Sequence, residues 1–125
     1  MVRDVCRTEA AKTMPAIYKI LPLSLWDEAK RTGIFHGSEV DLRDGYIHFS
    51  TAEQAVETAA KHFAGQSDLV LLAIQVEALG ESLKWEPSRG GALFPHLYAP
   101  LDVSLVLRAH PLPLAEHGRH IFPPL

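Results

Sequence analysis

The hydrophobic positions of the chain change their spacing from two residues to about 3.6 residues and back. Alternating or continuous apolar runs predict strands near residues 16–21, 46–49, 68–76, 83–86 and 103–107. Helical spacing predicts two helices, Leu25–Thr32 and Ala52–Ala64, with loops at 34–43 and 88–100. Because strands and helices do not alternate regularly, we expect an α+β domain with a bent, mostly antiparallel, split sheet.

The stretch that begins at residue 44 combines a turn with a short strand. Asp44-Gly45 is a turn dipeptide, and aromatic and β-branched residues follow it. Strand alternation places Ile47 and Phe49 on the face that turns toward the core. The opposite face carries a phenol, an imidazole and a hydroxyl, from Tyr46, His48 and Ser50. This face is a candidate site, and a strand face that only contacts solvent is the alternative. Arg43, which precedes the strand, is either solvated or turned toward a ligand anion.

A helix is predicted directly after this strand. Thr51 with Gln54 forms the pattern of a capping box, and Ser50 with Glu53 offers the same pattern one residue earlier. The predicted buried stripe of the helix consists of Ala55, Val56, Ala59 and Phe63. The unpaired N–H groups of a helix start suit an anion, so Ser50 and Thr51 are candidate ligand contacts. Capping alone is the alternative role for both.

A second polar set follows the predicted strand at 83–86. It consists of Glu86, Arg89, His96 and Tyr98. Two glycines beside Arg89 allow a close approach to a ligand, and its guanidinium can hold a phosphate or carboxylate in a fork. An extended segment around Pro95 would point His96 and Tyr98 the same way. Two imidazoles, from His48 and His96, suit general acid–base chemistry near neutral pH. The alternative is a loop packed on the sheet, with His96 hydrogen-bonded internally.

The composition is that of a single globular domain. The chain has 125 residues, 47% of them hydrophobic, and a formal net charge of −3, which gives no bulk attraction for DNA. We expect a tail at 1–15, one domain at 16–111 and a proline-rich tail at 112–125, with Met1 and Met14 both open as the native start. The single Cys6 excludes an intramolecular disulfide, and no apolar run has the length of a membrane span or a secretory signal. These features predict a cytoplasmic protein without a membrane partner.

The sequence shows no metal-binding spacing, because it contains no HExxH, no histidine pair four residues apart and no cysteine pair. It also has no GxGxxG, no P-loop and no GxSxG elbow. A zinc site built in space from His48, Glu86 and His96 stays open as a lesser alternative.

Two segments resemble a known family. DGYIHFST at 44–51, followed by LKWEPSRGGALFPHLYAPL at 83–101, looks like the small bacterial family catalogued as domain of unknown function 952, and the resemblance runs from about Ile17 to Pro111. That family's fold resembles the ADP-ribosyltransferase group, which includes poly-ADP-ribosylating enzymes and RNA 2′-phosphotransferases and clasps NAD in a split β structure.

The resemblance to that group implies a pocket between the first strand, the His48 strand and the segment 86–98. It also shows a departure from the group's pattern. Where those enzymes carry a pocket histidine in the first strand, this chain has Lys19, and Glu86 is the nearest counterpart of their late catalytic glutamate.

Together these observations predict a small-ligand-binding domain for a nucleotide-like, phosphorylated or acidic ligand. NAD-dependent transferase chemistry is the further option, with NAD as the candidate cofactor and His48 and Glu86 as the candidate catalytic residues. The candidate ligand contacts are Lys19, Tyr46, Ser50, Thr51, Arg89, His96 and Tyr98. The alternative is a degenerate, non-catalytic binding or structural module. Neither catalysis nor the oligomeric state is decided by the sequence.

Overall fold

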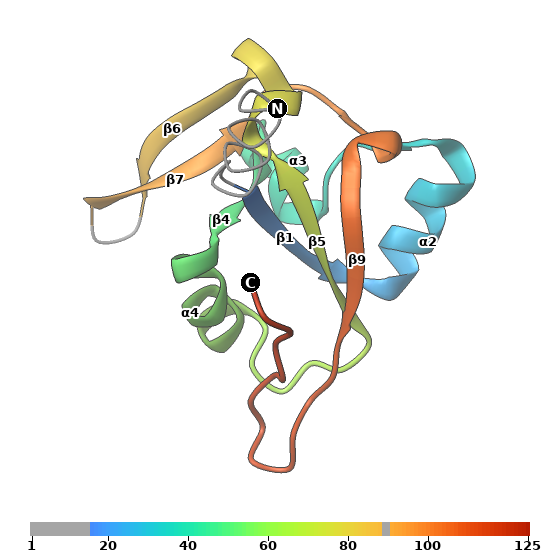
Figure 1. Cartoon of the computed structure of the whole chain (residues 1–125), viewed down its shortest axis with the longest axis vertical. Coiled ribbons are helices and arrows are strands. Elements are labelled where there is room, and N and C mark those ends of the chain that lie inside the picture. Colours follow the sequence, from blue (N-terminus) through green and yellow to red (C-terminus); the bar gives the residue numbers. More distant parts are fainter. Residues whose placement is uncertain (1–15, 89–90) are drawn as a thin grey trace, which may run out of the picture.

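The protein is built from open antiparallel sheets with few helices (Figure 1). A computed structural model describes residues 16–88 and 91–125. The main sheet has the order β4-β1-β5-β9, and its strands are β4 (Ser50–Thr51), β1 (Ala16–Pro22), β5 (Leu69–Gln75) and β9 (Val106–Leu112). Every strand pair within the described residues is antiparallel, which confirms the predicted sheet type. The expected tail at 1–15, with Cys6 and both candidate start residues, lies outside the described residues.

A second sheet carries the polar strand ends. Its order is β3-β7-β6, from β3 (Ile47–His48), β7 (Ala92–Leu97) and β6 (Leu83–Ser88). The hairpin of β6 and β7 extends to one side of the main sheet (Figure 1). A short ladder joins β2 (Ile34–Phe35) to β8 (Leu101–Asp102).

Two of the helices match the prediction, and a third corrects it. Helix α2 (Leu23–Thr32) begins two residues earlier than expected and ends at Gly33, whose φ of 89° is left-handed. Helix α4 (Ala52–His62) begins at Thr51, whose capping box with Gln54 is present as predicted. The short 3₁₀ helices η1 (Val76–Ser82) and η3 (Val103–Leu105) complete the helical elements.

The segment predicted as a loop at 34–43 contains helix α3 (Glu39–Asp44). A capping box between Ser38 and Asp41 starts this helix, and Gly45, with a φ of 89°, ends it. The loop prediction was wrong because this short segment has too few apolar residues to show a helical period. The Ser-x-x-Asp pattern at 38–41 was the one sign of a helix start.

The core lies on both faces of the main sheet, because alternate residues of β1 point to opposite sides. Ile17 and Leu21 pack with the buried Trp26 of α2 and with the buried side of the second sheet. Tyr18 and Ile20 pack against α4 on the other face. Strand β5 is buried from Leu69 to Ile74, as its continuous apolar run predicted.

The strand predicted at 46–49 is present only as β3, and the chain changes from one sheet to the other directly after it. Strand β3 pairs with β7, and β4, which follows it, pairs with β1. Phe49 lies at the break, where its N–H donates to the Pro95 carbonyl oxygen at 3.0 Å. The chain therefore bends between the two sheets while Ile47 and Phe49 stay buried in one core.

Several other boundaries differ from the prediction. The loop expected at 88–100 is largely strand β7, and Pro87 continues β6 instead of ending it, because proline is tolerated in an edge strand. The last strand begins at Val106 instead of residue 103. On α4, Val56 is 53% exposed, so it does not belong to the buried stripe that Ala55 and Ala59 form.

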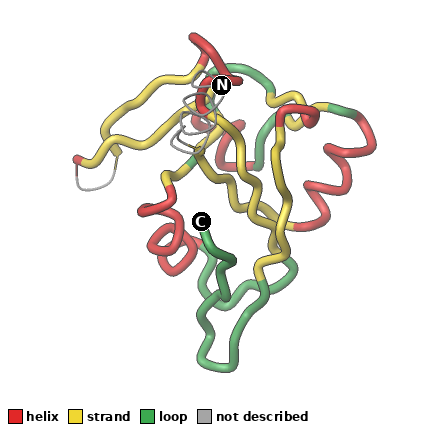
Figure 2. The backbone as a smooth tube through the Cα atoms, in the orientation of Figure 1, coloured by secondary structure: helices red, strands yellow, loops and turns green. Residues whose placement is uncertain are grey.

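The segment after β9 forms a long loop that turns back toward α4 (Figure 2). Phe122 packs against the core cluster beneath α4, and the His120 ring nitrogen Nε2 lies 2.8 Å from the Gln66 carbonyl oxygen. These contacts hold part of the proline-rich segment 112–125 against the domain.

Candidate functional site

A cleft of about 680 Å³ lies where the two sheets separate. Strand β1, helix α3 and the strand pair β3 and β7 supply its polar wall, and α4 and the residues after it supply another wall. The polar side chains that matter most there are Lys19, Asp41, Arg43, Asp44, His48 and His96.

The floor of this wall is a buried ion pair between β1 and α3. Lys19 Nζ lies 2.8 Å from Asp41 Oδ2 and 3.1 Å from Oδ1. The two side chains are only 7% and 1% exposed. Asp41 Oδ2 also accepts a hydrogen bond from the Ser38 backbone N–H at 2.8 Å, which is the capping contact of α3. The pair therefore fixes a six-residue helix against the sheet.

Asp41 also positions His48. Its Oδ1 lies 2.6 Å from His48 Nδ1 and accepts the His48 backbone N–H at 3.1 Å. On the other side of the ring, His48 Nε2 lies 3.0 Å from Asp44 Oδ2. Two carboxylates of one short helix thus hold the two nitrogens of one imidazole, a common way to fix ring orientation.

The ionisation of the buried pair follows from its surroundings. Burial raises the pKa of the Asp41 carboxyl, but the His48 hydrogen bond, the Lys19 charge and the other hydrogen bonds outweigh it, so the pKa lies well below its ordinary value. Burial lowers the pKa of Lys19, and Asp41 offsets this only in part. Asp41 is therefore a carboxylate at neutral pH and acts as an acceptor.

A second imidazole–carboxylate pair lies on the neighbouring strands. His96 Nδ1 lies 2.7 Å from Glu86 Oε1, and the Tyr98 hydroxyl donates to the same oxygen at 2.8 Å. His96 is buried, whereas Glu86 and Tyr98 are more open to solvent. The hydrogen bonds from His96 and Tyr98 lower the pKa of Glu86, and the bond to Glu86 in turn raises the pKa of Tyr98.

Tyr46 joins the two pairs into one cluster. Its ring stacks on His96 with centroids 4.1 Å apart and lies 4.6 Å from the His48 ring. The Tyr46 and Tyr98 rings lie 5.2 Å apart at a tilt, which leaves a surface of two phenols beside two imidazoles. Burial and the charges of Asp44 and Glu86 raise the pKa of Tyr46.

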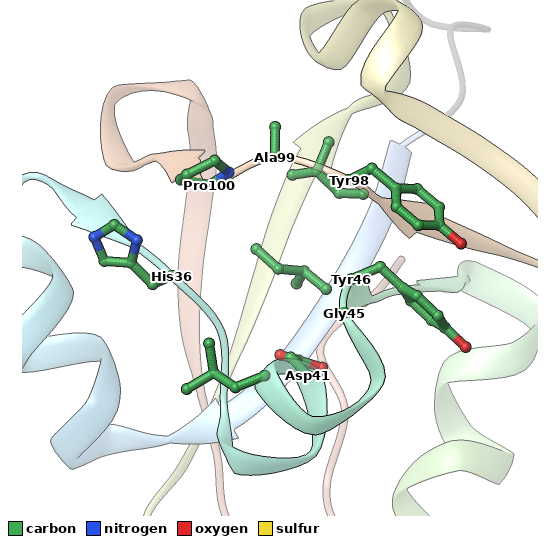
Figure 3. A pocket seen from close by; sticks show the side chains of 10 residues that line it. His36, Asp41, Gly45, Tyr46, Tyr98, Ala99 and Pro100 are labelled. Atoms are coloured by element: carbon green, nitrogen blue, oxygen red, sulfur yellow. The ribbon is translucent and has the colours of Figure 1, made fainter.

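A smaller pocket of about 260 Å³ lies behind this cluster (Figure 3). In Figure 3 the hydroxyls of Tyr46 and Tyr98 point to the same side, while His36 and Pro100 line the opposite end. Asp41 and Tyr46 line this pocket as well as the larger cleft.

The structure brings together most of the residues predicted for the site. Hydrogen bonds and ring contacts join Tyr46, His48, Glu86, His96 and Tyr98, and Lys19 reaches them through Asp41. Ser50 lines the cleft but pairs its hydroxyl with Thr58 Oγ1 at 3.0 Å, and Thr51 caps α4. Arg89 lies outside the described residues.

The sequence interpretation missed Asp41 and Asp44, which contact His48 directly. Asp41 was hidden in a segment interpreted as loop, and its only local signal was the capping pattern with Ser38. Asp44 was interpreted as half of a turn dipeptide. Within the ranges 16–88 and 91–125, no group of three His, Cys, Asp or Glu side chains is arranged to hold a metal ion, so the zinc alternative has no support. None of the helices in those ranges has the length and apolar content that a membrane span requires.

Comparison with known proteins identifies relatives. The family described as "Protein of unknown function (DUF952)" matches residues 20–109. The crystal structure of protein CC0527 from Caulobacter crescentus is 60% identical, with 85% of this chain and 93% of that chain covered and a TM-score of 0.82. The solution structure of CC0527 is 62% identical, with coverage of 83% and 90% and a TM-score of 0.77. A search of curated proteins finds no match. The chain belongs to the DUF952 family.

Proposed function

We propose that the cleft binds a small nucleotide-like or phosphorylated ligand. The observation that carries this proposal is that Tyr46 and both imidazoles, His48 and His96, line a cleft of about 680 Å³. Each imidazole is paired with a carboxylate. Cavities of roughly 300–1,000 Å³ with a few convergent polar groups are typical of small-molecule sites. The volume accommodates a nucleotide-sized molecule.

In this proposal the ring of Tyr46, which lines the cleft and has Tyr98 beside it, contacts a ligand ring, since phenols stack readily on planar groups. His48 and His96 then contact the ligand's hydroxyl or phosphate oxygens. Asp41 and Glu86 act through them as positioning residues, because each already lies within hydrogen-bond distance of a ring nitrogen Nδ1. Glu86 thus takes a supporting role in place of the catalytic one expected from the sequence.

Transferase chemistry with NAD is the finer form of the proposal, and it rests on the resemblance to ADP-ribosyltransferases, which stays a prediction. One observation favours the alternative of a non-catalytic binding module. The residue at the place of that group's pocket histidine is Lys19, and its ammonium is buried against Asp41. A buried ammonium that is paired in this way supports the fold.

The test is a thermal-shift screen of the full chain against nucleotides, NAD and phosphorylated metabolites. A ligand that binds only the folded state raises the apparent melting temperature. We expect a shift with at least one nucleotide, and a smaller shift for Tyr46→Leu, which removes the stacking ring. The control is Val56→Ala, on the exposed face of α4. No shift with any compound would overturn the proposal.

Arg89 is tested in the same assay. If it holds a ligand phosphate, Arg89→Ala weakens binding strongly and Arg89→Lys restores it only in part, because an ammonium cannot reproduce the fork of a guanidinium. Equal affinity of all three proteins would remove Arg89 from the site.

A further inference from the structure

We propose that the carboxylate of Asp44 occupies the subsite for the anionic group of the ligand, and that a bound phosphate takes its place on His48 and Arg43. The proposal rests on the proposed function only in that the ligand carries such a group. The proposal places the anionic group of the ligand next to His48 and Arg43. In the free protein the Asp44 carboxylate competes for the same position.

Two donors hold the Asp44 carboxylate at the cleft. Its Oδ2 lies 3.0 Å from His48 Nε2, and its Oδ1 lies 3.3 Å from Arg43 Nε. All three residues line the same cleft. An imidazole and a guanidinium that each contact one oxygen of a carboxylate present the donor pattern that a phosphate also uses.

The ring of His48 can use only one nitrogen for this purpose. Its Nδ1 is held at 2.6 Å by Asp41, which is buried and hydrogen-bonded on both oxygens. Nε2 is therefore the nitrogen left to contact Asp44, at 3.0 Å, and when it carries a hydrogen it donates to that carboxylate. Removing Asp44 leaves that donor without its acceptor.

The charges around the subsite favour an anion once Asp44 has moved. The negative charge of Asp41 is compensated by Lys19 at 2.8 Å. Arg43, which is 72% exposed, then keeps no other ion-pair partner among the described residues, so it can turn toward a ligand. Glu39 also lines the cleft, but it lies at the opposite end of α3 from Arg43. The vacated position next to His48 and Arg43 therefore has a positive character.

Displacement of Asp44 costs little. Its side chain is 32% exposed, in contrast to the 1% of Asp41, and exposed ion pairs contribute little to stability. Asp44 is also the last residue of α3, where the helix dipole disfavours a carboxylate. Gly45 follows it with a left-handed φ of 89°. A Cβ at this position would have no heavy atom within 4 Å, so the backbone next to Asp44 is not tightly packed.

The experiment measures the affinity of inorganic phosphate by NMR titration of the full chain and of Asp44→Ala. Because Asp44 occupies the subsite for most of the time in the free protein, removing it should tighten the apparent affinity for phosphate several-fold. Asp27→Ala is the matched control, because it deletes an equally negative, exposed, ion-paired aspartate on α2, outside the cleft lining. The gain is expected for Asp44→Ala alone.

A second variant assigns the gain to the subsite. Asp44→Ala combined with Arg43→Gln is expected to lose most of the gain, and the added change lies at an exposed position that does not threaten folding. The proposal is overturned if Asp44→Ala binds phosphate no better than the unmodified chain, if Asp27→Ala gains equally, or if the double variant keeps the full gain. A nucleotide screen without hits, together with tight phosphate binding by Asp44→Ala, would refute the proposed function and leave this subsite standing.

Discussion

His48 and His96 face each other as direct cross-strand partners of β3 and β7, with ring centroids 5.5 Å apart. Directly opposed residues of an antiparallel pair point to the same side of the sheet. A shift of the pairing by one residue would move one ring to the buried face. The cluster therefore depends on the pairing register of β3, a strand of two residues. The hydrogen bond from the Phe49 N–H to the Pro95 carbonyl oxygen extends this pairing by one residue.

Glu86 couples this cluster to Tyr98, and the coupling can be measured. Because the hydrogen bond to Glu86 is the main cause of the raised pKa of Tyr98, Glu86→Gln should lower that pKa toward its ordinary value. An NMR titration of the tyrosine rings follows the change. Glu81→Gln removes the same charge at an exposed position and should leave Tyr98 unaltered. An unchanged Tyr98 titration in Glu86→Gln would mean that the two side chains do not contact each other in solution.

Asp41 is expected to matter most for stability. Asp41→Asn leaves the buried Lys19 ammonium without its counter-charge, and breaking a buried pair in this way costs about 3–5 kcal/mol. Urea denaturation measures this loss as a lower midpoint. The double variant Asp41→Asn with Lys19→Met should recover part of it, because no buried charge remains. Asp27→Asn, on an exposed pair, should change the free energy of unfolding by less than about 0.5 kcal/mol.

The same carboxylate predicts the direction of the acid dependence. The pKa of Asp41 is lower in the folded than in the unfolded chain, so below its ordinary pKa of about 4 the unfolded chain binds more protons. The stabilisation by Asp41 is complete above that pH and is lost progressively as the pH falls below it. Unfolding free energies measured between about pH 2.5 and pH 7 should rise with pH more steeply for the original chain than for Asp41→Asn. Parallel curves would contradict the assignment.

The sequence predicted those parts of the fold that local rules decide. The capping box of Thr51 and the apolar run of β5 depend on neighbouring residues, and both were predicted correctly. The bend at Phe49 depends on which strands lie opposite, so the change from one sheet to the other directly after β3 was not predicted. Strand β7 was interpreted as loop because Pro95 and two glycines suggested one, although β6 supplies its pairing.

The residues of the candidate site also fall into those that the sequence could predict and those that it could not. The polar faces around His48 and His96 could be found from strand alternation and composition. Their carboxylate partners could not all be found, because Asp41 reaches His48 only through the packing of a six-residue helix against β1. Short helices carry little periodicity, and their position is set by tertiary contacts. A buried lysine such as Lys19 is the better signal, because it requires a nearby carboxylate that remains to be found.

The last prediction concerns the packing of α4. A fully packed phenylalanine would cost about 3–5 kcal/mol on truncation to alanine. Phe63 is only half-buried, caps the C-terminus of α4 and lines the cleft on one side. Since part of its ring already faces solvent, Phe63→Ala should cost about 1.5–2.5 kcal/mol.

Two substitutions bracket that value. Trp26→Ala, at a side chain 7% exposed in the core, should cost about 3–5 kcal/mol. Val56→Ala, on the exposed face of α4, should be neutral within about 0.5 kcal/mol, since alanine is the better helix former. Denaturant midpoints at constant slope give all three numbers. A cost for Phe63→Ala as large as that of Trp26→Ala would mean that the ring is fully enclosed in solution, and that the end of the cleft next to α4 is closed.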